Sequence, residues 1–131
     1  MSRMPLVEDL MDRQFPTVRP DTRIEEAMEL LVDKRLIGVL VVDADGELRG
    51  VFSEKDCLRV LVHDGFHQRP DDTVASYMHP VPATVGSKVD ILTAAQTFLA
   101  SDFRRLPVVD DGKLVGQITR RDIVRGMSKY R

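Results

Sequence analysis

The sequence lacks the features that mark secreted, membrane-spanning or disulfide-linked proteins. Its 131 residues include one cysteine, Cys57, so no disulfide can form within the chain. A reducing, cytoplasmic compartment is therefore expected. The opening residues contain no uninterrupted apolar stretch of signal-peptide length. The longest apolar run, residues 37–42, is far too short to span a membrane.

Aromatic residues and net charge are also scarce. There is no tryptophan, aromatic residues make up 5% of the chain, and 19 basic against 21 acidic side chains leave a net charge of -2. Nucleic-acid-binding proteins commonly show a basic excess or stacking aromatics, so no nucleic-acid partner is expected. Residues 101–131 differ, with a net charge of +4. This segment keeps a nucleic-acid-associated protein as a distant alternative.

Motifs for catalysis and for metal binding are missing as well. The chain has no G-x-S-x-G nucleophile turn, no G-x-x-x-x-G-K-[ST] phosphate loop and no G-x-G-x-x-G fingerprint. His63 and His67 have i, i+4 spacing, but Gly65 lies between them and no further ligand is near in sequence. We expect neither an enzyme nor a metal site.

What the sequence does contain is an internal repeat. Residues 7–44 align with 74–111, and residues 46–58 align with 112–124. Thirteen of the 51 paired positions are identical, where chance gives about three. The identical pairs include Met11/Met78, Thr17/Thr84, Val18/Val85, Ile24/Ile91, Ala27/Ala94, Asp43/Asp110, Gly46/Gly112, Gly50/Gly116 and Asp56/Asp122. The chain is therefore a duplication of one unit.

Each copy is predicted to follow the order β-α-β-β-α. A short extended segment leads to a helix, which a Thr22–Glu25 capping box would start in the first copy and Ser87 together with Asp90 in the second. Helical spacing predicts buried stripes of Ile24, Ala27, Met28 and Leu31, and of Ile91, Ala94, Ala95, Phe98 and Leu99. Two strands joined by a turn come next, and a last helix begins after Ser53 or Thr119.

The doubled order and the runs VVDADGELRGVFSEKD and VVDDGKLVGQITRRD resemble a tandem pair of CBS domains, named for cystathionine beta-synthase and often called a Bateman module. The resemblance places CBS repeat 1 at residues 5–60, a linker at 61–71 and CBS repeat 2 at 72–128. It implies an α+β (α/β-like) fold whose repeats pack through their sheets with pseudo-two-fold symmetry. It also implies a stand-alone regulatory sensor that forms a homodimer of four repeats.

The resemblance further implies a ligand, namely AMP, ADP, ATP or S-adenosylmethionine, with or without magnesium, in a cleft between the repeats. No cofactor is required. The implied contacts lie before the first helix, at the start of the first hairpin strand and in the S/T-x-x-D run. They are Thr17, Val18, Gly38, Val39, Ser53 and Asp56 in the first copy, and Thr84, Val85, Arg105, Leu106, Pro107, Thr119, Arg120, Arg121 and Asp122 in the second.

The S/T-x-x-D run supports two interpretations on chemical grounds. Its carboxylate can accept two hydrogen bonds from a ribose diol, and its hydroxyl adjoins the free N–H groups of a helix N-terminus, which suit a phosphate. The same spacing is also an approximate capping box, which stabilises a helix by about 1 kcal/mol and binds nothing. A ligand-free dimerisation module is therefore the main alternative to a sensor.

The two copies differ in charge near the predicted site. The second copy has Arg104, Arg105, Arg120, Arg121 and Arg125, where the first has Ile37, Gly38, Glu54, Lys55 and Arg59. Phosphate oxygens favour arginine, so the second copy is the better phosphate site, unless these arginines form a solvated rim or a dimer face. Since no output domain is apparent, an effector protein is expected to read the ligand state.

Overall fold

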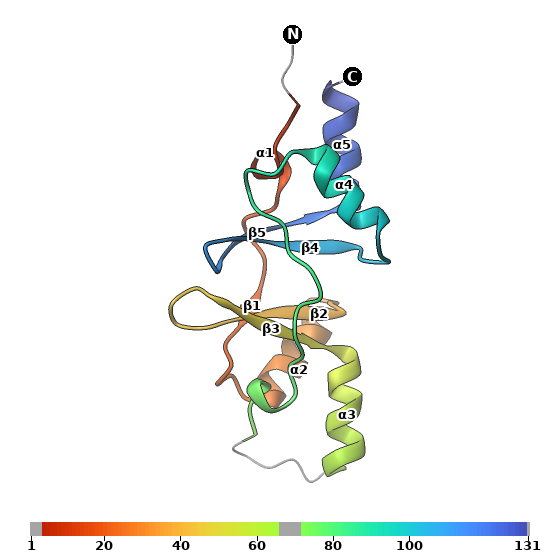
Figure 1. The fold of residues 1–131 in the computed structure, drawn as a ribbon. Helices are drawn as coiled ribbons and strands as arrows, with labels where there is room; N and C mark the ends of the chain where they lie inside the picture. The colour runs from red at the N-terminus through yellow and green to blue at the C-terminus, as the bar shows by residue number, and fades with distance from the viewer. Residues whose placement is uncertain (1–3, 66–71, 131) are drawn as a thin grey trace. The chain divides into compact units, whose positions relative to one another are not determined.

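A computed structural model describes residues 4–65 and 72–130 (Figure 1). The chain forms two compact units. We call residues 16–81 the first-repeat unit, and residues 1–15 with 82–131 the second-repeat unit. Each unit thus combines the helices and hairpin of one copy with the leading segment of the other copy.

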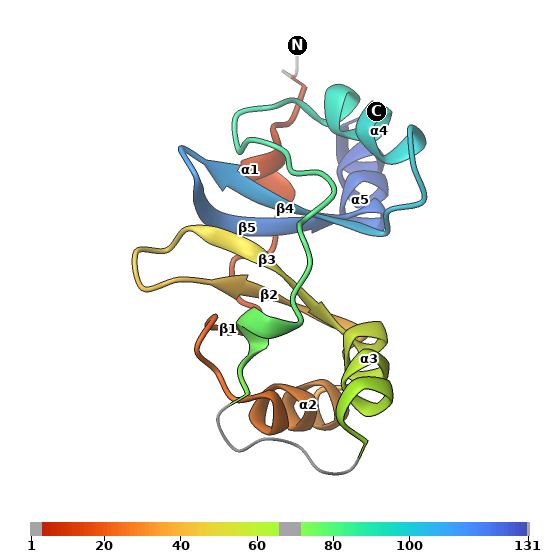
Figure 2. The same cartoon turned by 60° about the horizontal axis from the view of Figure 1, so that its bottom comes forward.

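The first-repeat unit contains a three-stranded sheet in the order β1-β2-β3. Strand β1 runs parallel to β2, and β3 runs antiparallel to β2. Helices α2 and α3 cover the same face of this sheet (Figure 2). The elements are β1 (Thr17–Val18), α2 (Ile24–Asp33), β2 (Gly38–Val42), β3 (Leu48–Ser53), α3 (Glu54–Asp64) and the 3-10 helix η1 (Val74–Ser76).

The second-repeat unit repeats this plan. Its hairpin pairs β4 with β5, and Val85 forms a parallel bridge with Val108 where β1 pairs with β2 in the other unit. Both hairpins have a register shift at the equivalent place, Val41/Val42 and Val108/Val109. The elements are α1 (Val7–Leu10), α4 (Ile91–Leu99), β4 (Arg105–Asp110), β5 (Lys113–Thr119) and α5 (Arg120–Tyr130). The predicted duplication and its α+β character are confirmed.

The leading segments dock in the same way in both units. The N–H of Val7 donates to the carbonyl of Val89 (2.8 Å), and its counterpart Val74 donates to Thr22 (2.8 Å). Val7 and Val74 are both fully buried in their cores. Because the docking contacts repeat, the exchange of leading segments is a property of the duplicated unit.

Two identical glycines of the repeat make this docking possible. A Cβ at Gly50 would lie 2.7 Å from the backbone oxygen of His79, and one at Gly116 would lie 2.6 Å from the sulfur of Met11. In each unit the leading segment passes so close to its strand that a side chain at this position would force a neighbouring atom to shift. The identical pairs Gly50/Gly116 and Met11/Met78 therefore form the same packing contact in both units.

Three details of the predicted helices are wrong. Helix α2 has Arg23 at its N-cap, and Thr22 Oγ1 accepts instead from the Arg19 N–H (2.9 Å). Ser87 does not cap α4, because its side chain and its N–H donate to Asp110; Asp90 is the cap and accepts from Thr93 N–H (2.8 Å).

The third error is Leu99, predicted on the buried stripe of its helix. It is 86% exposed, because α4 ends there and Phe98 takes the inward position. The other predicted stripe residues lie in or against the two cores, which contain, among others, Ile24, Ala27, Leu31, Ile91, Ala94 and Phe98.

Helix α3 extends to Asp64, which is inside the segment predicted as a linker. Residues 66–71 of that segment, with His67, lie outside the described residues. The repeat boundaries 5–60 and 72–128 and the sheet-to-sheet packing stay predictions. In the part of the chain that the structure describes, no helix is long and apolar enough to cross a membrane.

Candidate functional site

The second-repeat unit brings the predicted contact segments to one end of its hairpin. Arg105, at the start of β4, pairs across the sheet with Thr119 at the end of β5. The N–H of Val85 donates to the carbonyl of Pro107 (3.0 Å), which joins the extended segment to β4. Helix α5 starts directly after Thr119 and carries Asp122 in its first turn.

The first-repeat unit makes the equivalent arrangement. Gly38 pairs with Ser53 at the same end of its hairpin, and Thr17 pairs with Leu40. The Glu54 N–H donates to the carbonyl of Ile37 (2.9 Å), which fixes the start of α3 against β2.

The predicted contact residues differ in burial: Gly38, Ser53, Thr119 and Asp122 are half-buried, Asp56 is buried, and the others are either buried or exposed. Those whose side chains pack in the cores, and which could meet a ligand only through backbone atoms, are Val18, Val39, Val85, Leu106 and Pro107. Exposed side chains are those of Thr17, Thr84, Arg105, Arg120 and Arg121. A ligand in either unit would therefore contact a few polar side chains and a backbone edge.

The S/T-x-x-D run caps its helix in both units. Ser53 accepts from the Asp56 N–H (3.3 Å), and the Asp56 carboxylate accepts from the Ser53 N–H (2.8 Å). Thr119 and Asp122 form the same reciprocal pair, at 3.1 and 2.8 Å. The capping interpretation is confirmed. Whether either aspartate can also bind a ligand depends on how many further hydrogen bonds its carboxylate can accept.

Asp56 is fully buried in the first-repeat unit. Besides the Ser53 N–H, its Oδ2 accepts from the Ser53 hydroxyl (2.9 Å) and contacts His79 Nδ1 (2.9 Å). Because an ionised carboxylate only accepts, Nδ1 carries the proton of this contact. Its Oδ1 accepts from Arg59 (2.7 Å).

Asp122 has fewer partners. Its Oδ2 accepts from the Thr119 N–H, its Oδ1 accepts from Arg125 (2.6 Å), and its side chain is 13% exposed. The described residues supply it with no third hydrogen bond. A carboxylate has about four acceptor positions, so each oxygen of Asp122 keeps one.

The residue that separates the two sites was missed by sequence reasoning. His79 precedes a proline and is typical of a loop residue; its counterpart in the repeat is Asp12. Both residues form an antiparallel backbone bridge, His79 with Val51 and Asp12 with Gln117. The contact with Asp56 spans 23 residues and depends on the exchanged leading segment, which no local pattern reveals.

The arginines of the second copy are exposed, as a phosphate site requires. Arg120 Nε donates to the carbonyl of Phe103 (2.8 Å), which holds the guanidinium near the start of α5. Within the described part of the second-repeat unit, Arg104, Arg105 and Arg121 form no side-chain hydrogen bond or ion pair. Glu54 takes the place of Arg120 in the first copy.

Cys57, next to Asp56, packs against the first core. Burial raises the pKa of its thiol, and the charges of Asp56 and Glu54 raise that pKa further. The thiol is therefore protonated at neutral pH and is a poor nucleophile.

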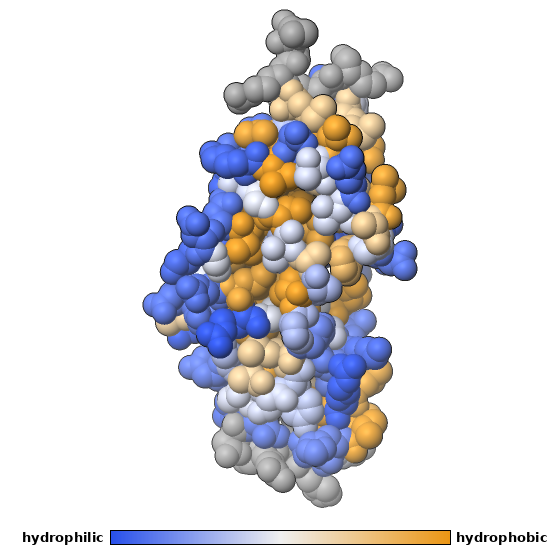
Figure 3. Space-filling view, in the orientation of Figure 1, coloured by the Kyte–Doolittle hydropathy of each residue, from blue (hydrophilic) through white to orange (hydrophobic). Residues whose placement is uncertain are grey.

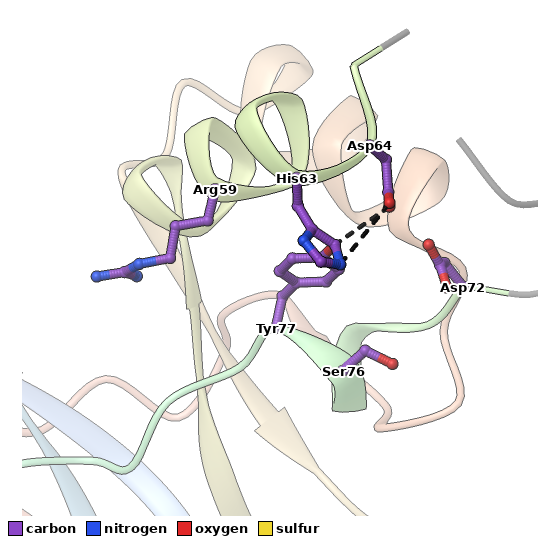
Figure 4. Close-up of a pocket in the computed structure, with 6 residues that line it drawn as sticks. All are labelled: Arg59, His63, Asp64, Asp72, Ser76 and Tyr77. Atoms are coloured by element: carbon purple, nitrogen blue, oxygen red, sulfur yellow. Dashed lines mark hydrogen bonds and ion pairs between the residues drawn. The ribbon is translucent and has the colours of Figure 1, made fainter. Parts of the chain in front are cut away.

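A pocket of about 490 Å³ lies elsewhere in the first-repeat unit, between the end of α3 and the segment around η1 (Figure 4). Its lining residues are Arg59, His63, Asp64, Asp72, Ser76 and Tyr77. Asp64 accepts from the Tyr77 hydroxyl (3.2 Å) and lies 3.9 Å from His63 Nε2. None of the predicted contact residues lines this pocket.

Across residues 4–65 and 72–130, no three His, Cys, Asp or Glu side chains are grouped so that they could hold a metal ion.

The duplicated hairpins, exchanged segments and capped S/T-x-x-D turns define a tandem pair of CBS domains. The family model for the CBS domain matches residues 7–63 and 74–129, so the chain belongs to the CBS domain family.

Individual relatives agree. The chain is 36% identical over 134 residues to the chloroplastic CBS domain-containing protein CBSX1 of Arabidopsis thaliana, with 82% of this chain and 57% of the relative covered. It is 29% identical to a CBS domain-containing protein of Dictyostelium discoideum, with coverages of 91% and 88%. The chain spans about half the length of the first curated relatives it matches.

A solved structure shows the same fold. The crystal structure of CBSX2 in complex with AMP superposes with a TM-score of 0.78 at 35% identity, with 95% of this chain and 97% of that chain covered. The chain thus shares the fold of a solved CBS-pair protein.

Proposed function

We propose that the chain binds an adenosine-containing ligand at the Thr119–Asp122 turn and acts as a ligand sensor. The observation that carries this proposal is Asp122, which keeps one open acceptor position on each oxygen at the N-terminus of α5. A vicinal diol supplies two hydroxyl donors side by side, which suits this carboxylate. The described geometry of the second-repeat unit supports a ribose contact there.

The nature of the ligand is supported by similarity. CBSX2, which shares 35% identity and this fold, has been crystallised with AMP. Arg105 and Arg121, exposed and without ion-pair partners in the described residues, would supply charge for a phosphate. AMP is therefore the first ligand to test, followed by ADP, ATP and S-adenosylmethionine; magnesium and any required cofactor stay outside the proposal.

Signalling is proposed to pass through a second copy and an effector protein. Large apolar side chains are exposed on α3 in the first-repeat unit and on α5 in the second-repeat unit, and Figure 3 shows apolar groups among the hydrophilic ones on the surface in view. The residues concerned are Leu58, Leu61 and Val62 on α3, and Val124 and Met127 on α5. Covering them in a homodimer would let ligand binding bias how the copies pack.

The test is a thermal-shift panel on nucleotide-stripped protein. It uses AMP, ADP, ATP, S-adenosylmethionine and NAD, each with and without magnesium, and GTP as the control. A ligand at 100 times its Kd adds about 2.7 kcal/mol, which raises the Tm of a chain this size by several degrees. We expect a rise with an adenosine-containing ligand that disappears in Asp122→Ala.

Two outcomes would favour the alternatives. A panel without any shift, together with a stable dimer by light scattering, supports a ligand-free dimerisation module. Binding to DNA or RNA that weakens steeply with salt supports a nucleic-acid-associated protein. A cytoplasmic location stays a prediction from the single cysteine.

A further inference from the structure

The two S/T-x-x-D carboxylates differ in how many hydrogen bonds they already accept. Asp56 Oδ2 accepts three, from the Ser53 N–H, the Ser53 hydroxyl and His79 Nδ1. An oxygen of a carboxylate has two lone pairs, so this atom has no position left for a ligand hydroxyl. Asp122 Oδ2 accepts one hydrogen bond, from the Thr119 N–H.

The exposure of the two side chains differs in the same direction. The Asp56 side chain is 1% exposed, and the Asp122 side chain is 13% exposed. His79 covers Asp56 from the solvent side, because its own side chain is 42% exposed while its Nδ1 points to the carboxylate. The imidazole therefore stands between solvent and Asp56.

His79 is held in this place by the backbone. Its N–H donates to the carbonyl of Val51 (3.0 Å), and its carbonyl accepts from the Val51 N–H (2.9 Å). The bare backbone of Gly50 allows this close approach. This pairing fixes the backbone of His79 beside β3, which keeps the imidazole within reach of Asp56.

We propose that His79 takes, in the first copy, the place of a ligand diol on Asp56, so that the chain binds one adenosine-containing ligand and binds it through Asp122. The inference rests on the proposed function and adds a residue that decides how many ligands the duplicated chain accepts. An internal imidazole closes one of two sites that the repeat makes equivalent.

In the second copy no histidine of the described residues covers the equivalent carboxylate, Asp122. The counterpart of His79 is Asp12, whose backbone pairs with Gln117 in the same way. Its Oδ1 accepts from the Gln14 N–H (2.9 Å), and an ionised carboxylate has no proton to donate to Asp122. The Asp122 site therefore stays open to a diol.

The test is isothermal titration of the purified full chain with AMP, in wild type, His79→Ala and His79→Asn. Wild type is expected to bind one AMP per chain. His79→Ala leaves Asp56 Oδ2 with two hydrogen bonds from Ser53, and because the Ser53 hydroxyl can rotate away, one position becomes available to a ligand; this variant is expected to bind a second AMP. His79→Asn is the matched control, because its amide N–H can replace Nδ1 as the donor, and it is expected to bind one.

Asp122→Asn, with its fold verified by circular dichroism, shows which copy is used. It keeps an acceptor for the Thr119 N–H but loses charge and one acceptor, and AMP affinity should fall about tenfold or more. Two AMP per wild-type chain, or one AMP in His79→Ala, overturns the inference while the proposed function stands. Unchanged affinity in Asp122→Asn overturns the binding site that both assign to Asp122. Absence of AMP binding in all variants overturns both for this ligand.

Discussion

The first and second copies share a turn but differ in what its carboxylate does. Both turns form the same reciprocal helix cap, Ser53 with Asp56 and Thr119 with Asp122. Each carboxylate also accepts from an arginine one turn later, Arg59 or Arg125, but Asp56 is buried and contacts His79, whereas Asp122 is partly exposed with open acceptor positions. Duplication thus preserves the structural role of the residue in both copies, whereas we propose a binding role for one copy alone.

The largest expected effect comes from removing each carboxylate. Asp56→Ala should lower the free energy of unfolding by about 3 kcal/mol, because it removes a cap and the charge-assisted bonds of a buried group. Asp122→Ala should lower it by about 1 kcal/mol, the usual value of a cap. Urea unfolding of both variants measures the difference, and equal losses would contradict the distinction between the copies.

The paired glycines give the next largest difference. A Cβ at Gly50 meets the backbone oxygen of His79 at 2.7 Å, whereas at Gly116 the nearest atom is the sulfur of the flexible Met11 side chain and the backbone oxygen of Asp12 lies farther away, at 3.0 Å. Gly50→Ala should cost about 2 kcal/mol and Gly116→Ala about 1 kcal/mol, since both are overpacking changes.

Gly38→Ala is the control for these variants, because its Cβ would meet ordinary contacts at 3.6 Å or more. Thermal unfolding should rank the destabilisation as Gly50, Gly116, Gly38. The reverse order for the first two would show that the His79 segment yields more easily than the structure implies.

The His79 contact itself has a smaller effect on stability. His79→Ala should lower the free energy of unfolding by about 1 kcal/mol, the net value of one hydrogen bond, and His79→Asn should preserve most of it. The comparison of both variants by urea unfolding requires no ligand. An identical loss in the two variants would show that the imidazole acts by packing and not by its Nδ1 proton.

The smallest effect concerns the turn aspartates Asp43 and Asp110. Hydrogen bonds from the Ser87 hydroxyl and N–H lower the pKa of Asp110, and hydrogen bonds from Glu47 N–H, Asp45 N–H and Arg49 lower that of Asp43. A lowered folded-state pKa gives stability that is present above the unfolded value and is lost as pH falls through the folded value.

Ser87→Ala should therefore raise the pKa of Asp110 toward its ordinary value of 3.8 and leave Asp43 unchanged. The loss of stability on acidification should become shallower in this variant. Carboxyl carbon NMR titration follows both residues in one sample, with Asp43 as the internal control. An unchanged Asp110 titration would contradict the role given to the Ser87 hydroxyl.

Much of this molecule could be predicted from its sequence because duplication doubles each signal. The hairpins, the helix starts after Ser53 and Thr119, and the β-α-β-β-α order are local patterns, and each appears twice. The prediction of Thr22 as the N-cap was wrong, because the helix begins at Ile24 with Arg23 as its N-cap. The Thr22 hydroxyl accepts from the Arg19 N–H instead. The prediction that Leu99 is buried was wrong, because hydrophobic periodicity does not show where a helix ends.

The contact that distinguishes the sites could not be predicted. His79 reaches Asp56 only because residues after the first copy return to pack on it, as Val7 packs on the second copy. Sequence alignment of the repeats pairs Asp12 with His79 but gives no reason to place either beside a carboxylate. The His79–Asp56 contact arises from tertiary pairing between segments that are distant in sequence, which a local sequence pattern does not show.

The most direct test of the account is amide NMR of the full chain during titration with AMP. We predict saturable shifts for the amides of Thr119 and Asp122 and no comparable change at Ser53 and Asp56, whose hydrogen bonds are already made. Shifts at Ser53 and Asp56 with the same affinity, while Thr119 and Asp122 stay unchanged, would contradict the account.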